Sequence, residues 1–468
     1  MRSALSFLPL ILFATSTQAA DWPWWRGPLG TGVSPESGLP ATWSPDQGIA
    51  WEAPLAGAGV SSPVVTGDRV FVTSQSGRGA LKPGQHPLLA RTDPEVARAE
   101  RALRHGTEAP VAGASAHAAG GADLPAPEVD GALEGERGVV FVIEAFDRET
   151  GRRLWRHRMP AEGELPRVHE KHNLASPSPV TDGERVYAWF GNGQVVALAL
   201  DGQRVWQRHL AEENGPFTLD WGHGSSPALH GDLLYLLCYH EPASYLLAVD
   251  KRTGMTRWKV DRGAGIRSYS TPIVIAGPAG DELLVNSTDG VHAYDPATGE
   301  LLWHAGGEHR FGIGMPSLHD GILYASRGYR SGPYLAIRPG ARGGADVTAT
   351  HVVWKADTGA PYVSSLLVHH GLVYMGSDTG VVTCVDAATG EKLWQERTGG
   401  IFSASPVAGD GRVYFTSETG ETFVYALARE PRLLGRNRID GRIVGSPAIA
   451  GGRIYLRTDD RLIAIDGT

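Results

Sequence analysis

Cysteine is nearly absent from this chain of 468 residues, which contains only Cys238 and Cys384. Two cysteines do not by themselves establish a disulfide, even in an oxidising compartment. Both lie in apolar, strand-like runs, "LLYLLCY" and "VVTCVD". We therefore expect two buried free thiols.

An excess of positive charge is also missing, since the net charge is −8. The chain therefore lacks the overall basic character of a nucleic-acid-binding protein, and we expect no nucleic-acid partner. No G-x-S-x-G, G-x-x-x-x-G-K-[ST] or G-x-G-x-x-G motif occurs. Their absence argues against a nucleophile elbow, a P-loop and a dinucleotide-binding turn.

The N-terminus is typical of an export signal. Arg2 supplies the positive end, "ALSFLPLILFA" the short apolar core and "STQAA" the small residues for cleavage after Ala19 or Ala20. The apolar run is shorter than the roughly 20 residues of a membrane span. No cysteine follows the cleavage region. We therefore predict a signal peptide at residues 1–20 and a periplasmic or secreted protein with no membrane span or lipid anchor.

Two phrases recur along the chain. The first is "AYDPATGELLW", ending at Trp303, with variants that end at Trp155, Trp206, Trp258 and Trp394. The second resembles "SSPVVTGDRVFVTS" and occurs eight times, with a spacing of about 41 to 49 residues from the second copy onward. This period indicates a repeat architecture.

Each repeat predicts four short antiparallel strands. The Ser-Pro start suits a first strand, and alternating runs such as "RVYFTS" are separated by Gly-containing turns. In the Asp-x-x-Thr-Gly turn, Asp can bind turn amides and Gly can adopt a positive φ. The tryptophan lies on the outer strand, where it can pack between neighbouring sheets. The pattern predicts an all-β, eight-bladed β-propeller.

The eighth copy ends at "LIAIDGT" without an outer strand, whereas "IAWEAPL" (49–55) has that pattern. We predict that this segment completes the last blade and closes the ring. The predicted organisation is a signal peptide (1–20), an N-terminal segment (21–48) and the propeller (49–468). An insertion at 75–137 interrupts blade one, with a short helix predicted over 92–106 from a capping box.

These repeats resemble the pyrroloquinoline-quinone (PQQ) repeat family, whose tryptophan-docking motif builds eight-bladed propellers. The N-terminal "DWPWWRGPLGTGVSPESGLP" resembles the start of secreted bacterial members. The family includes quinoprotein alcohol dehydrogenases and the outer-membrane assembly protein BamB. The resemblance implies either a binding scaffold or a PQQ- and Ca²⁺-dependent enzyme. The adjacent cysteine pair typical of the dehydrogenases is absent, and their calcium ligands and catalytic Asp have no matching positions.

Non-repeated polar and aromatic residues gather in the connections between blades and in the turns between middle strands. Cationic groups flanked by aromatic planes suit an anionic or carbohydrate-like ligand. The alternative is that these side chains bind backbone groups or solvent. The ligand-binding candidates are His169, Lys171, His172, Trp221, His223, His240, Arg267, Tyr269, Arg310, Arg327, Tyr329, Arg330 and Tyr362. Their spacing matches no specific zinc pattern, so no metal site is predicted.

The leading functional hypothesis is a monomeric binding scaffold that recognises a protein partner or an anionic or glycan-like ligand on this loop-rich face. One alternative is a PQQ/Ca²⁺-dependent oxidoreductase. A second is a carbohydrate-active hydrolase or lyase that uses histidine and tyrosine. No catalytic residue is assigned from the sequence.

Overall fold

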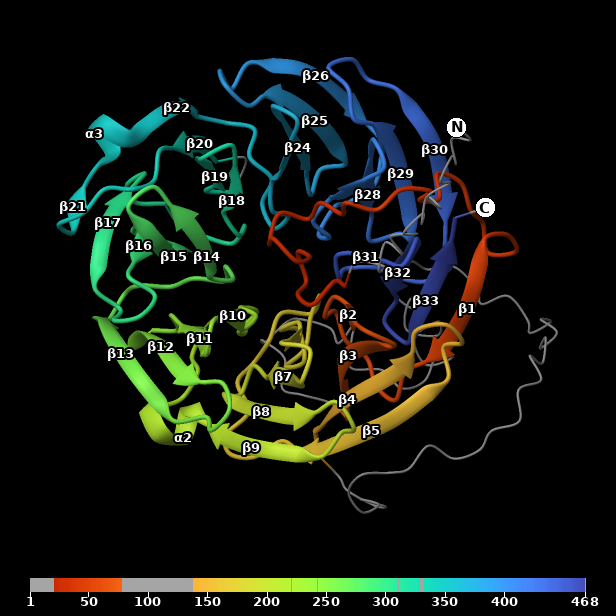
Figure 1. Ribbon diagram of the computed structural model, residues 1–468, viewed down its shortest axis with the longest axis horizontal. Coiled ribbons are helices and arrows are strands. Elements are labelled where there is room, and N and C mark those ends of the chain that lie inside the picture. Colours follow the sequence, from red (N-terminus) through yellow and green to blue (C-terminus); the bar gives the residue numbers. More distant parts are fainter. Residues whose placement is uncertain are drawn as a thin grey trace, which may run out of the picture.

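The computed structural model describes residues 21–77, 138–219, 221–241, 243–309, 311–328 and 332–467. Eight antiparallel blades are arranged around a central axis, which confirms the predicted propeller (Figure 1). Two short helices, α2 (Leu210–Asn214) and α3 (Thr348–His351), lie in connections. The predicted signal peptide, the helix over 92–106 and insertion residues 78–137 lie outside the described residues.

The strands of the first four blades follow the chain in order from the axis outward. Blade one contains β2 (Val64–Thr66), β3 (Arg69–Ser76), β4 (Val140–Asp147) and β5 (Arg153–Pro160). Blade two contains β6 (Val180–Thr181), β7 (Arg185–Trp189), β8 (Gln194–Ala199) and β9 (Arg204–His209). Blade three contains β10 (Ala228–His230), β11 (Leu233–Cys238), β12 (Ser244–Asp250) and β13 (Thr256–Gly263). Blade four contains β14 (Ile273–Gly277), β15 (Gly280–Ser287), β16 (Gly290–Tyr294) and β17 (Leu301–Ala305), with β21 (Ala345–Asp346) added in parallel.

The remaining blades repeat this order, except that the last outer strand comes from the N-terminus. Blade five contains β18 (Ser317–His319), β19 (Ile322–Ser326), β20 (Tyr334–Ile337) and β22 (Val352–Ala356). Blade six contains β23 (Leu367–His369), β24 (Leu372–Gly376), β25 (Val381–Asp386) and β26 (Lys392–Arg397). Blade seven contains β27 (Val407–Gly409), β28 (Arg412–Thr416), β29 (Glu421–Ala426) and β30 (Leu433–Arg438). Blade eight contains β31 (Ala448–Ala450), β32 (Arg453–Arg457), β33 (Arg461–Asp466) and β1 (Ile49–Pro54).

Strand β1 closes the ring, as the missing outer strand of the last repeat predicted. It pairs antiparallel with β33, and Trp51 lies opposite Ala464. The two strands lie side by side at the rim (Figure 1). Because this pairing joins the two ends of the chain, no edge of blade eight is left without its outer strand.

The repeated tryptophans join neighbouring blades through the same contact, except for Trp303, whose indole donates to Glu282 Oε2 within blade four at 2.9 Å. The Trp51 indole N–H donates to the backbone oxygen of Arg148 in blade one at 3.0 Å, and Trp155 donates to Leu200 in blade two at 2.7 Å. The ring lies against the turn glycine of the next blade, so that a Cβ on Gly151 would be 2.5 Å from Trp51. Glycine is therefore required at this position for steric reasons as well as for its positive φ. The same contact is made by Trp206, Trp258, Trp354 and Trp394.

The Asp-x-x-Thr-Gly turns are held by the aspartate side chain. In blade three, Asp250 Oδ1 accepts backbone N–H groups from Arg252 and Thr253, both at 3.0 Å. Arg257 donates to the other carboxylate oxygen at 2.8 Å. Because these partners stabilise the ionised form, the Arg257 hydrogen bond first and then the turn hydrogen bonds, the pKa of Asp250 is lowered to about 2. The predicted role of the aspartate in this turn is confirmed.

We expect Asp250→Asn to lower the free energy of unfolding by about 1.5–3 kcal/mol at pH 7, the range for hydrogen bonds to a charged group. The folded-state pKa lies below the usual value, so this stabilisation is present above about pH 4 and is lost as the pH falls toward 2. Guanidinium unfolding of both proteins across this range measures the difference. A difference that stays constant from pH 7 to pH 2 would contradict the assigned role of the carboxylate.

The hydrophobic core lies between the blades. Phe141 of blade one stacks on Phe190, next to blade two, with ring centroids 4.1 Å apart. Buried side chains of these two blades form one continuous cluster. Each blade is therefore stabilised by burying both of its faces against its neighbours.

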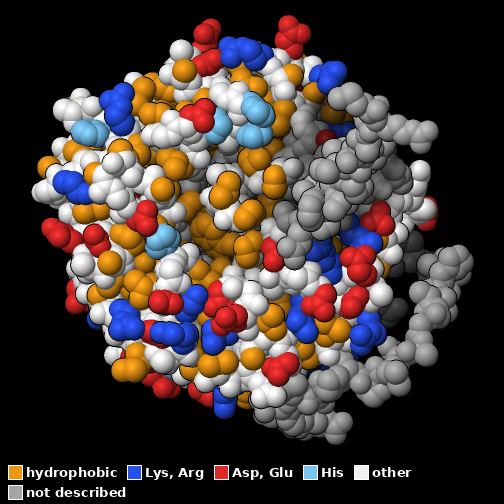
Figure 2. Space-filling view, viewed as in Figure 1, with side chains coloured by type: hydrophobic (Ala, Val, Ile, Leu, Met, Phe, Trp, Pro, Cys, Tyr) orange, Lys and Arg blue, Asp and Glu red, His pale blue; other side chains and the backbone are white. Residues whose placement is uncertain are grey.

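The N-terminal segment (21–48) runs from the rim to the middle of the disc, where it is drawn in red (Figure 1). On the face seen in Figure 2, hydrophobic side chains gather in the recessed middle, and charged side chains lie mostly toward the rim. Among the described residues, none of the helices has the length and apolar character needed to cross a membrane.

Candidate functional site

A cavity of about 600 Å³ lies on the propeller axis. We call it the funnel, because residues that precede or begin the first strands of all eight blades converge on it. Its lining comprises Trp25, Val60, Ser62, His169, Lys171, His172, Ser176, Ser178, Trp221, Gly222, Gly224, Ser226, Tyr269, Thr271, Ile313, Tyr362, Val363, Ser365, Asp378, Ser403, Ser405, Val444, Gly445 and Ser446. Its size is within the range of pockets that enclose small organic ligands.

The N-terminal run "WPWWR" contributes to the end of the funnel next to the first strands. Trp22 forms a β-bridge with Val65 of blade one, and the Trp24 indole donates to the Pro227 backbone oxygen beside blade three at 3.1 Å. Trp25 lines the cavity itself. Five consecutive residues thus reach several blades around the axis, and we call the part of the funnel lining that Trp25 contributes the floor.

Arg26 anchors this floor. Its guanidinium is completely buried and donates to the backbone oxygens of Pro406 at 2.6 Å, Thr31 at 2.9 Å and Leu366 at 3.1 Å. Burial lowers the pKa of Arg26 to about 9, so the side chain remains charged at neutral pH. Among the described residues, no carboxylate forms an ion pair with it. A positive charge held only by backbone carbonyls therefore lies next to the funnel floor.

Aromatic side chains form part of the funnel wall. The rings of His169 and Trp221 lie 5.1 Å apart, and the backbone N–H of His169 donates to the Trp221 oxygen at 3.1 Å. The His172 ring contacts the same oxygen, and its Nδ1 lies 3.0 Å from the Ser176 hydroxyl. Burial lowers the pKa of His172, which favours the neutral ring. These contacts join two inter-blade connections and fix the position of the Trp221 backbone.

Charged residues lie beside the aromatic wall. Lys171 Nζ forms an ion pair with Glu418 Oε1 at 3.0 Å, and Ser403 donates to the same oxygen at 2.5 Å. The Lys171 side chain is 41% exposed, so it also faces solvent in the cavity. Arg442 donates to the Lys171 backbone oxygen at 3.2 Å. The ammonium group is thus held in place and retains N–H donors for a ligand.

The structure brings together six of the predicted ligand-binding residues in the funnel lining. They are His169, Lys171, His172, Trp221, Tyr269 and Tyr362. Each comes from a connection that precedes a first strand, which is where the sequence placed them. Their role in binding stays a prediction.

Four other candidates lie elsewhere. Arg327 is fully buried, and its guanidinium donates to Asn286 Oδ1 at 2.5 Å and to the Gly307 backbone oxygen at 2.9 Å. It therefore joins loops of blades four and five. Arg267 forms an ion pair with Glu241 at 3.0 Å. His223 and His240 are each only 1% exposed. None of these four side chains lines the funnel, and the remaining candidates, Arg310, Tyr329 and Arg330, lie outside the described residues.

His223 and His240 belong to a buried aromatic cluster. The ring centroid of His223 lies 4.2 Å from that of Trp189, and that of His240 lies 4.4 Å from that of Phe217. Among the described residues, no hydrogen-bond partner meets their ring nitrogens. Burial accordingly lowers the pKa of His223 to about 3 and that of His240 to about 4. Both rings are neutral at pH 7.

We expect His223→Phe to reduce the acid sensitivity of the fold. The unfolded chain binds a proton at this histidine below about pH 6.5, whereas the folded chain does not until about pH 3. Stability is therefore lost as the pH falls below 6.5, by about 2 kcal/mol per such residue at pH 5. Guanidinium unfolding at pH 7.5 and pH 5 should show a smaller loss for the variant than for the wild type. Equal losses would mean that this ring does not remain neutral in the fold.

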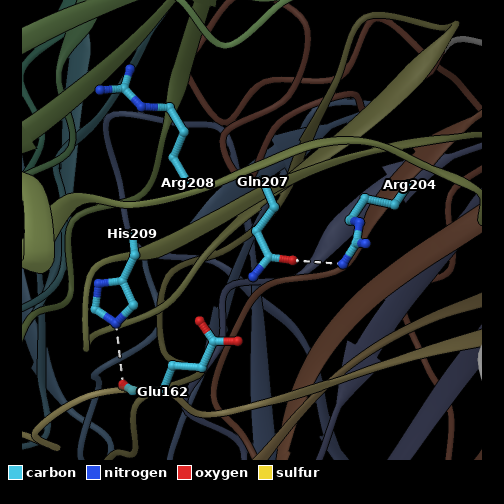
Figure 3. A pocket seen from close by; sticks show the side chains of 5 residues that line it. All are labelled: Glu162, Arg204, Gln207, Arg208 and His209. Atoms are coloured by element: carbon cyan, nitrogen blue, oxygen red, sulfur yellow. Dashed lines mark hydrogen bonds between the residues drawn. The ribbon is translucent and has the colours of Figure 1, made fainter.

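A second pocket, of about 440 Å³, lies on the outer strand β9. In Figure 3, Gln207 is turned toward Arg204 and the His209 ring toward the Glu162 backbone, at 3.0 and 3.2 Å. Arg208 extends away from the other four side chains (Figure 3) and forms an ion pair with Glu213. The lining comprises these five residues only, and each drawn hydrogen bond is internal to the pocket. We therefore assign the site to the funnel, whose lining converges from all eight blades.

Cys238 and Cys384 are buried free thiols, as predicted. Burial raises the pKa of each to about 12, so neither forms a thiolate at neutral pH. Within the described ranges, no group of three or more His, Cys, Asp and Glu residues is arranged to hold a metal ion.

Several funnel residues were missed by the sequence analysis. Trp25 belongs to the N-terminal segment, which has no counterpart in the repeats. Asp378 lies in a turn between β24 and β25. The Ser-Pro phrases were interpreted as strand starts, although their hydroxyls also line the cavity. The presence of serine or threonine in seven of the eight repeats was the available signal for these hydroxyls.

Fold and site together define an eight-bladed propeller with a central ligand-sized funnel. The family described as outer membrane protein assembly factor BamB matches residues 104–219, 136–396, 344–432 and 378–468. The chain belongs to this PQQ-repeat, BamB-like family of eight-bladed β-propellers, which is related to quinoprotein dehydrogenases.

Individual relatives differ in their described activities. A polyvinylalcohol dehydrogenase from Pseudomonas sp is 25% identical over 445 residues, which cover 79% of this chain and 66% of that relative. This chain thus spans slightly less than two thirds of the relative's length. BamB from Moraxella catarrhalis has a TM-score of 0.52 at 18% identity, covering 73% of this chain and 92% of that one. A europium-containing methanol dehydrogenase has a TM-score of 0.60 at 10% identity, and the match covers 93% of this chain and 89% of that one. The two structures support the fold alone.

Proposed function

We propose that this protein is a binding protein whose funnel takes an acidic carbohydrate, that is, a sugar chain that carries carboxylates. The observation that carries the proposal is the convergence of Trp221, Tyr269 and Tyr362 with Lys171 in one cavity of about 600 Å³. Aromatic faces pack against the C–H faces of sugar rings, and an ammonium group binds a carboxylate. We further propose a monomer that acts in the periplasm or outside the cell.

The contacts around Lys171 support an anionic ligand. Among the described residues, its ammonium group makes one hydrogen bond, to Glu418 Oε1 at 3.0 Å. An ammonium group has three N–H donors, so a ligand carboxylate can bind without displacing Glu418. The nine serine and threonine residues of the lining add hydrogen-bonding partners for sugar hydroxyl groups.

The test is a calorimetric titration with two matched trisaccharides, α-1,4-linked trigalacturonate and its neutral counterpart, galactotriose. These probes share ring stereochemistry and differ in the carboxylates. We expect saturable binding of trigalacturonate, weaker binding of galactotriose, and loss of this preference in Lys171→Gln. Arg204→Gln, in the second pocket on β9 (the rim pocket), is the control and should bind as the wild type does. Absence of saturation by either sugar contradicts a carbohydrate site, and equal affinity for both contradicts the acidic preference.

A second candidate function is the dehydrogenation of an alcohol, which the similarity to a polyvinylalcohol dehydrogenase favours. PQQ is a tricarboxylate, and in the alternative derived from the sequence it acts with Ca²⁺, an ion that takes six to eight oxygen ligands. The described funnel lining contains one ammonium group, Lys171, and one carboxylate, Asp378. One ammonium group and one carboxylate do not fit PQQ together with Ca²⁺, and we derive no catalytic step from these two groups. Dye reduction by PQQ-loaded protein with an alcohol substrate tests this candidate directly.

A further inference from the structure

Seven hydroxyl groups form a ring at the inner end of the funnel. Each belongs to the residue that begins the Ser-Pro phrase of one repeat or its equivalent, and each side chain is between 1% and 5% exposed. The ring comprises Ser62, Ser178, Ser226, Thr271, Ser365, Ser405 and Ser446. Blade five contributes Met315 at the eighth position. The ring surrounds the axis and is open only between blades four and five.

Backbone N–H groups fix the orientation of these hydroxyls. Except for Thr271, whose neighbour in the next blade is Met315, the N–H of each ring residue donates to the hydroxyl oxygen of the next blade, as Ser62 does to Ser178 at 2.8 Å and Ser446 does to Ser62 at 2.9 Å. The other five bonds, from Ser178, Ser226, Met315, Ser365 and Ser405, measure 2.9 to 3.1 Å. Every ring oxygen is thus an acceptor. Accepting a hydrogen bond makes an O–H group a better donor.

The seven O–H protons have no acceptor in the hydrogen bonds of the described residues, although all seven side chains line the funnel. The Trp25 indole N–H is also buried without a partner in the described part of the chain, and Trp25 lines the same cavity. Several hydrogen-bond donors therefore line the same cavity. Buried donors without acceptors are unfavourable unless a ligand or a water molecule accepts their hydrogen bonds.

Arg26 supplies positive charge at the same place. It donates to the backbone oxygens of Leu366 and Pro406, which directly follow the ring residues Ser365 and Ser405. Its Nε has no hydrogen-bond partner in the described part of the chain. Its guanidinium carbon lies 5.7 Å from the ring centroid of Trp25. The Arg26 cation thus binds the backbone directly next to two residues of the hydroxyl ring. Among the described residues, no carboxylate is bonded to it.

We propose that the hydroxyl ring is a binding site for one small anion, held by the O–H groups of the ring and the Trp25 N–H and stabilised by the charge of Arg26. Hydroxyl and N–H donors around a nearby cation favour a negative ligand. The anion is either a free inorganic oxyanion or the carboxylate of an organic ligand. The proposal goes beyond the carbohydrate function, because it requires neither trigalacturonate nor the aromatic wall.

The test is a calorimetric titration of the full mature protein with sodium sulfate and, separately, sodium formate at constant ionic strength. We expect saturable one-site binding of at least one of them. Binding of sulfate alone assigns the site to inorganic oxyanions, and binding of formate extends it to carboxylates. Thr271→Val keeps the side-chain shape, removes one donor and should weaken binding about tenfold, which corresponds to one hydrogen bond to a charged group.

Thr73→Val is the matched control. Thr73 is fully buried and does not line the funnel, and its hydroxyl donates to the Pro177 backbone oxygen at 3.2 Å. This variant should bind the anion as the wild type does. Two results overturn the proposal: no saturation by either anion, or equal weakening by Thr271→Val and Thr73→Val. Since neither probe is a sugar, failure here is distinguishable from failure of the carbohydrate proposal.

Discussion

Replacement of Arg26 by methionine is expected to lower the free energy of unfolding by about 3–5 kcal/mol, because three buried or half-buried backbone carbonyls lose their donor. Methionine approximates the length of the side chain but leaves the carbonyls of Thr31, Leu366 and Pro406 without this donor. Each unsatisfied buried acceptor costs about 1–3 kcal/mol. Because Leu366 and Pro406 belong to different blades, the loss should also reduce the cooperativity of unfolding around blades six and seven.

Guanidinium unfolding followed by circular dichroism measures this effect. Arg26→Lys retains the charge but not the planar fork, so it should recover only part of the loss. Arg204→Met, on the outer strand β9, is the control and should change stability by less than about 0.5 kcal/mol. If Arg26→Met unfolded at the same denaturant concentration as the wild type, the N-terminal run would not be an essential part of the propeller centre.

The second large effect is expected at Trp221. Trp221→Ala should weaken trigalacturonate binding by at least about 30-fold, equivalent to about 2 kcal/mol for a central aromatic anchor. The fold should change little, because His169 and His172 keep their contacts with the backbone oxygen of Trp221, although the contact between the His169 and Trp221 rings is lost. The backbone contacts remain possible with alanine.

Titration of Trp221→Ala and Trp221→Phe with trigalacturonate separates the contribution of an aromatic plane from that of the larger indole area. Phenylalanine keeps an aromatic plane of smaller area, so its affinity should lie between those of alanine and tryptophan. Equal thermal unfolding midpoints for the three proteins would exclude misfolding as the cause. An affinity within twofold of the wild type for Trp221→Ala would place the sugar elsewhere.

The architecture could be predicted from the sequence because each blade uses the same local contacts. Asp250 and its equivalents hold a turn, the turn glycine makes room for a tryptophan, and the tryptophan binds the next blade. These roles require particular residues at fixed spacing, so they recur visibly. The strand at 49–55 was recognisable for the same reason, since Trp51 fills the position left empty in the last repeat.

The centre of the molecule could be predicted less well. Arg26 contacts Pro406, which is 380 residues away in the chain, and no local pattern indicates such a pairing. Arg327 was proposed to face a ligand, but it is buried and held by Asn286 and backbone oxygens. A sequence shows that a residue is charged but does not show whether carbonyl groups will surround it. The hydroxyl ring was likewise hidden within a motif that also begins a strand.

The most direct test of the account is a crystal structure of the protein with trigalacturonate bound. The account predicts the sugar in the funnel, with a ring against Trp221 and a carboxylate within hydrogen-bonding distance of Lys171 Nζ. A sugar bound in the rim pocket on β9, or along an outer blade edge with the funnel unoccupied, would contradict the assignment of the funnel as the functional site.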